Sequence, residues 1–125
     1  MIRTALFPAL ALAFGTWTAT PAAAQDFEPV TELGTFVDLL DGRELRLGLF
    51  GIALQVTPDG RIEGEARGDT VTGTWVWEDG YFCREMAWGD TPIPYNCQLV
   101  EARGERQMRF TTDRGAGESA SFNLR

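Results

Sequence analysis

The chain contains no histidine and no lysine among its 125 residues, so all 11 of its basic side chains are arginines. Without histidine it has no Ser-His-Asp or Cys-His nucleophile arrangement, and it lacks the imidazole ligands of most zinc and copper sites. Without lysine it cannot form a Schiff base with a substrate. We therefore predict a non-enzymatic protein with no catalytic residues, no cofactor and no metal.

The carboxylates of this sequence do not indicate a catalytic or calcium-binding site. Asp79 with Glu85 or Asp90 is the pair that a carboxylate-only mechanism such as glycoside hydrolysis would use. Carboxylates beside turns are usually solvated, so we interpret these three as surface groups. The spaced acidic loop of an EF-hand calcium site is missing. The match of residues 115–120 to G-x-G-x-x-A is interpreted as a turn, because a dinucleotide site also needs a strand before it and a helix after it.

Cysteine is scarce, with Cys83 and Cys97 as the only two residues of this type. An even number of cysteines in a small exported domain predicts a disulfide. The bond would close a loop of about 15 residues, which is worth about 3 kcal/mol in the chain-entropy model.

The sequence also lacks an apolar run long enough to span a membrane, which takes roughly 20 residues. The segment from Leu6 to Trp17 is almost wholly apolar. It follows Arg3 and precedes the small residues up to Ala24, which is the pattern of a cleaved secretory signal. We predict a signal peptide at residues 1–24 and a single domain at residues 25–125. The mature protein would be periplasmic or secreted, with no membrane span.

Acidic residues outnumber basic ones. With Arg3 removed in the signal, 10 arginines face 18 Asp and Glu residues, a formal charge of −8. Such a surface disfavours nucleic acid and anionic membranes as partners, and it permits a basic protein partner.

The first part of the predicted domain has a helical pattern between Thr31, a predicted cap, and Gly42, a predicted stop. Five apolar residues recur there at helical spacing: Val30, Leu33, Phe36, Val37 and Leu40.

From Glu44 onward, apolar and polar residues alternate in short runs separated by turns such as Pro58–Gly60 and Asp79–Gly80. This pattern predicts seven or eight short strands after one short N-terminal helix. The expected fold is mostly β, an antiparallel meander that forms a small barrel or sandwich.

Aromatic residues crowd into the stretch from Trp75 to Tyr95. Together with one arginine they are the candidate binding residues: Trp75, Trp77, Tyr81, Arg84, Trp88 and Tyr95. The leading hypothesis is a barrel that binds a small apolar ligand in a cavity lined by Trp75, Trp77 and Phe110. Under the simpler interpretation, Trp75 and Trp77 fill the core. Trp88 is expected in an irregular loop, where it would contact a partner.

An alternative hypothesis is an acidic periplasmic inhibitor or adaptor that binds a basic protein through acidic loops and Trp88. Its association would be sensitive to salt. An enzyme is the least favoured of the three function classes.

Three stretches carry a family resemblance: residues 73–83 (Gly-Thr-Trp-Val-Trp-Glu-Asp-Gly-Tyr-Phe-Cys), residues 41–45 and residues 92–97. The chain resembles small exported alphaproteobacterial proteins of unknown function, some of which carry the name dihydrodipicolinate reductase. That enzyme is a larger cytoplasmic Rossmann protein with a His- and Lys-containing site, and this chain has neither residue. The resemblance therefore implies no functional residues here.

Two further resemblances concern the fold. The Gly73-x-Trp75 triplet within a β meander is similar to lipocalin-type barrels, where the triplet lies on the first strand. A small, acidic, disulfide-closed β domain is also similar to periplasmic lysozyme inhibitors, and residues 118–122 loosely match their C-terminal Ser-Gly motif.

Overall fold

The computed structural model describes residues 11–17 and 26–125. Residues 11–17 form no helix or strand, and their side chains are exposed. The rest of the predicted signal segment, including the predicted cleavage site after Ala24, lies outside the described residues. Within the described part of the chain, no helix has the length and apolar character needed to cross a membrane.

Residues 26–125 form nine strands and one α-helix. The elements in chain order are β1 (Glu28–Pro29), α1 (Leu33–Leu40), β2 (Leu45–Leu47), β3 (Ile52–Val56), β4 (Arg61–Ala66), β5 (Asp69–Glu78), β6 (Tyr81–Trp88), β7 (Thr91–Arg103), β8 (Gln107–Thr111) and β9 (Ser119–Leu124). Short 3-10 turns occupy residues 48–50 and 113–115.

The strands form a closed barrel. From β2 to β9 each strand pairs antiparallel with the next, and β9 returns to pair with β2. The barrel therefore has eight strands, and β1 is an extra strand that pairs with β7. The predicted antiparallel meander is confirmed, and of the two predicted architectures the chain adopts the barrel.

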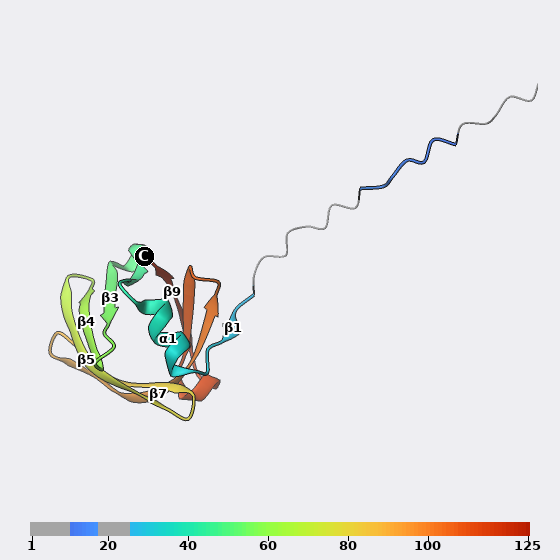
Figure 1. Ribbon diagram of the computed structural model, residues 1–125. Coiled ribbons are helices and arrows are strands. Elements are labelled where there is room, and N and C mark those ends of the chain that lie inside the picture. The colour runs from blue at the N-terminus through green and yellow to red at the C-terminus, as the bar shows by residue number, and fades with distance from the viewer. Residues whose placement is uncertain (1–10, 18–25) are drawn as a thin grey trace, which may run out of the picture.

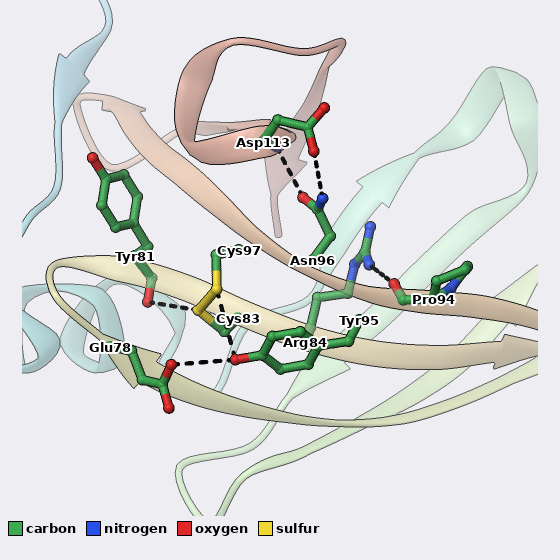
Figure 2. The surroundings of a disulfide bond; sticks show 9 residues. All are labelled: Glu78, Tyr81, Cys83, Arg84, Pro94, Tyr95, Asn96, Cys97 and Asp113. Atoms are coloured by element: carbon green, nitrogen blue, oxygen red, sulfur yellow. Dashed lines mark hydrogen bonds between the residues drawn. A yellow bond between two sulfur atoms is a disulfide. The ribbon is translucent and has the colours of Figure 1, made fainter.

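Strand β7 changes partners along its length. Its first half, residues 91–98, pairs with β6, and its second half, residues 99–103, pairs with β8. Two hydrogen bonds fasten the loop between β8 and β9 to the first half of β7, because Asn96 Nδ2 donates to Asp113 Oδ1 (2.8 Å) and the Asp113 N–H donates to Asn96 Oδ1 (3.0 Å) (Figure 2).

The predicted helix is present, but it begins later than predicted. Its N-cap is Glu32 rather than Thr31. The chain before it is still held in an extended form, because the Val30 N–H donates to the Val100 carbonyl and the Thr31 carbonyl accepts from the Trp77 indole. Gly42 follows the helix at a positive φ of 67°, as a stop signal requires.

Helix α1 closes one end of the barrel. Phe36 is fully buried and packs against the rings of Trp75, Trp77 and Phe82 at centroid distances of 5.5, 4.9 and 5.2 Å. In Figure 1 the helix lies between the wall that contains β3 to β5 and the wall that contains β9. Just after the helix, Arg43 Nη1 donates to the carbonyl of Glu105, in the turn between β7 and β8. The aromatic core therefore lies in the half of the barrel next to the helix. A cavity of about 250 Å³ remains in that half between α1 and the strands, and Phe36, Leu40 and Trp75 are among the residues that line it.

Candidate functional site

The barrel half away from α1 contains two adjoining cavities. The inner compartment has a volume of about 300 Å³ and the outer compartment about 340 Å³. The inner compartment is lined by Leu45, Leu54, Val56, Ile62, Phe82, Arg84, Met86, Gln98, Phe110, Thr112, Glu118, Ser119, Ala120 and Phe122. The outer compartment is lined by Ile52, Leu54, Ala66, Arg67, Val71, Met86, Trp88, Ile93 and Phe122. Leu54, Met86 and Phe122 belong to both linings, so the two spaces meet at these side chains.

Small residues occupy part of the inward face of β4 and β5 in this half of the barrel. Side chains alternate between the two faces of a strand, so Gly64 and Ala66 share the inward face of β4 with the buried Ile62. Gly73 on β5 lies opposite Ile62 in the register. A Cβ atom at Gly64 would lie 2.1 Å from the Ala53 carbonyl oxygen, so a larger residue does not fit there. The sequence thus provides little side-chain volume on this part of the inner wall.

Arg84 brings a positive charge into the inner compartment. Its side chain is only 8% exposed, and its Nη1 donates to the Pro94 carbonyl at 2.7 Å (Figure 2). The register of β6 with β7 shifts between Arg84 and Met86, which places a bulge at Pro94 and Tyr95. A bulge frees backbone groups from the strand ladder, and Arg84 satisfies the Pro94 carbonyl there.

Within the described residues, Arg84 forms no ion pair with a carboxylate. Burial lowers the pKa of Arg84 below its ordinary value, but a guanidinium stays protonated in proteins. The site therefore holds a desolvated positive charge that is bonded to a neutral carbonyl.

Gln98 is the second buried polar residue of the inner compartment, whose lining also includes Thr112, Glu118 and Ser119. It is 7% exposed, and its side-chain amide makes no hydrogen bond within the described part of the protein. Gln98 lies opposite Phe82, one inward position from Arg84. No fully enclosed side-chain nitrogen or oxygen among the described residues lacks a partner, so the free polar atoms of Arg84 and Gln98 must reach accessible space. We infer that this space is the compartment they line.

Trp75 and Trp77 belong to the aromatic core. Both pack on Phe36, and their indole N–H groups donate to the carbonyls of Thr57 (2.9 Å) and Thr31 (3.4 Å). Neither lines the two compartments, in contrast to the cavity expected from the sequence, whereas Phe110 does line the inner one. The reason is the helix, which inserts Phe36 between these rings.

Trp88 was expected in a loop, and this placement is wrong. It is the last residue of β6, where it lies opposite Val71 on one side and Thr91 on the other. Its indole N–H donates to the Ala66 carbonyl at 2.7 Å, and its ring lines the outer compartment. Trp88 is therefore a half-buried residue of the barrel interior, not an exposed loop contact for a basic partner.

Tyr81 and Tyr95 line neither compartment. Tyr95 is 52% exposed, and its hydroxyl lies 3.3 Å from a Glu78 carboxylate oxygen (Figure 2). Desolvation and the negative charge of Glu78 raise the pKa of Tyr95. Of the six candidate binding residues, the structure thus brings Arg84 and Trp88 to the cavity. The two tyrosines do not lie there.

Cys83 and Cys97 form the predicted disulfide, which is confirmed. Their sulfur atoms and a Glu78 carboxylate lie within 4.8 Å of one another, the one such grouping of potential metal ligands among the described residues. Both sulfurs are bonded to each other and offer no thiolate, so we assign no metal to this group.

Leu54, Met86, Ile93 and Phe122 line the cavity but were not predicted as site residues. The alternation of β3 gave a signal for Leu54, since it places Leu54 on the inward face with Val56. Alternation shows that a residue points inward, but it does not distinguish a core residue from one that lines a cavity.

Comparisons with protein-family models, curated proteins and solved structures found no match to this chain. The resemblance to small exported alphaproteobacterial proteins stays a prediction.

Proposed function

We propose that this protein is an exported, non-enzymatic barrel that binds a small, mainly apolar molecule in the half not filled by the aromatic core. The observation that carries the proposal is the pair of adjoining compartments. Their volumes of about 300 and 340 Å³ each reach the lower end of the range of small-molecule sites, roughly 300–1,000 Å³. Except for Arg67, every residue that lines the outer compartment is apolar.

The lining also supplies a driving force. Leu54, Met86 and Phe122 pack against the buried core but are themselves only partly buried, because one side of each faces the cavity. Covering apolar surface contributes about 25 cal/mol per Å². A ligand that fills the space would therefore stabilise the protein as it binds.

Binding of a neutral apolar dye tests the proposal. We expect N-phenyl-1-naphthylamine to bind the purified domain with increased dye fluorescence and to raise the Tm of the protein. Native mass spectrometry of freshly purified protein would show whether an apolar compound is retained. If the dye neither fluoresces nor shifts the Tm, the binding-barrel proposal fails.

Blocking the junction of the compartments should abolish this binding. Leu54→Trp places a bulky ring where the two spaces meet, and we expect dye affinity to fall by at least about tenfold. Overpacking costs about 1–3 kcal/mol, so the variant should still fold. The matched control is Val76→Trp on the outer face, where Val76 is 49% exposed. Equal affinity of the Leu54→Trp variant and the wild type would show that the dye binds elsewhere.

The proposal of export rests on the secretory pattern at residues 1–24 and on the disulfide. Disulfides persist in oxidising compartments and are rare in the cytosol. We expect the intact mass of the native protein to correspond to a chain that begins at Gln25 and contains no free thiol. A full-length mass, or two free thiols in protein from the periplasm or medium, would contradict export.

A further inference from the structure

Arg84 is the one charged side chain among the buried polar residues of the described structure, which also include Gln98 and Thr111. A charge placed in an apolar interior is costly unless it is paired and hydrogen-bonded. Here one nitrogen of the guanidinium bonds a neutral carbonyl, and no carboxylate lies in ion-pair range within the described residues. An arginine used only to cap the Pro94 carbonyl would carry an uncompensated charge.

The surroundings of this charge match an amphiphilic ligand. Arg84 and Gln98 line the inner compartment, and Leu54, Met86 and Phe122 lead from it into the outer compartment, whose lining is apolar except for the exposed Arg67. Polar groups gathered at one end of an apolar cavity orient a ligand that is itself polar at one end.

We propose that the ligand is an apolar carboxylic acid, with its carboxylate on Arg84 and its hydrocarbon part in the outer compartment. This inference rests on the proposed binding function and names its ligand class. Guanidinium and carboxylate are complementary in shape and form short, charge-assisted hydrogen bonds. The amide of Gln98 would donate to the same head group.

The charge count favours a monocarboxylate over a phosphate monoester. A single carboxylate neutralises the single charge of Arg84, whereas a dianionic phosphate would leave an excess negative charge in an apolar site. Glu118 also lines the inner compartment, but its side chain is exposed and forms no ion pair with Arg84. The negative charge of Glu118 in the same lining repels a dianion more strongly than a monoanion.

Competition against bound N-phenyl-1-naphthylamine tests the proposal on the wild-type protein. The competitors are decanoate, 1-decanol and decyl phosphate, which share one tail and differ in the head group. We expect decanoate to compete about 10- to 100-fold more strongly than 1-decanol, the range set by hydrogen bonds to a charged group. Decyl phosphate should be weaker than decanoate.

The variant Arg84→Met removes the charge and keeps a side chain of similar reach. We expect it to lose the preference for decanoate over 1-decanol, measured as the ratio of their competition constants against the bound dye. Arg106→Met is the matched control, because Arg106 is exposed in the turn between β7 and β8 and lines neither compartment. This control should keep the full preference.

The outcomes separate the two proposals. If the dye binds but decanoate and 1-decanol compete equally, the carboxylic-acid inference is overturned and the apolar-ligand function stands. Retention of the preference in Arg84→Met, or stronger competition by decyl phosphate, also overturns it. If the dye does not bind, the proposed function itself fails. The wild-type comparison decides the matter even if Arg84→Met does not fold.

Discussion

Phe36→Ala is expected to lower the free energy of unfolding by about 3–5 kcal/mol, the range for truncating a buried phenylalanine. Phe36 is fully buried and lies within 6.5 Å, centroid to centroid, of four aromatic rings. Phe36 and Leu40 are the two buried side chains of the short helix α1, and an isolated helix of this length is not stable in water. The truncation should therefore weaken the packing of the helix as well as that of the rings.

Urea unfolding followed by tryptophan fluorescence measures this loss. The matched control is Phe50→Ala, because Phe50 is 43% exposed in the turn before β3 and its ring contacts Arg67. We expect the control to change stability by less than about 1 kcal/mol, as surface substitutions do. Similar losses of unfolding free energy for Phe36→Ala and Phe50→Ala would show that α1 does not pack into the barrel core as described.

Local sequence patterns predicted the helix and the strands well, because these elements depend mainly on residues that are close together in the sequence. The alternation of Ile52, Leu54 and Val56 marked β3, and the Asp79–Gly80 turn joined β5 to β6 as expected. Barrel and sandwich could not be separated in this way. The closure depends on the pairing of β2 with β9 and on the change of partner along β7, both of which join residues far apart in the sequence.

The candidate site was harder to predict because a cavity is a property of packing. Inward-facing positions follow from alternation, but whether Trp75 or Trp88 lines the two adjoining compartments depends on the end of the barrel at which α1 lies. The sequence pattern contains no information on that choice. Apolar residues lie on both faces of β6 around Cys83, so alternation alone did not show that Arg84 points inward. The structure shows it, because Arg84 lies opposite the buried Trp75 in the register of β5 with β6.

Removal of the disulfide is the second large effect that we expect. Cys83 and Cys97 lie directly opposite each other on β6 and β7, and the bond closes a 14-residue separation. The variant Cys83→Ala/Cys97→Ala should lose about 2–5 kcal/mol of stability, measured by urea unfolding. Reduced wild type should match it, and a reductant should have no effect on the variant. A wild-type protein whose midpoint is insensitive to reductant would contradict the expectation.

The loss should be concentrated in the first half of β7. Residues 91–98 pair with β6 on one side, while β8 pairs only with residues 99–103, so the disulfide and the Asn96–Asp113 contact hold this half in place. Hydrogen exchange should therefore rise in residues 91–98 more than in β2 and β3. Because the Pro94 carbonyl that orients Arg84 lies in the same segment, the variant should also show a weaker preference for decanoate over 1-decanol, with dye binding retained. A uniform rise in hydrogen exchange over the whole barrel would show that the disulfide does not act specifically on the segment that holds Arg84. Faster hydrogen exchange in residues 91–98, together with a weaker preference for decanoate over 1-decanol, would show that the disulfide supports ligand selection.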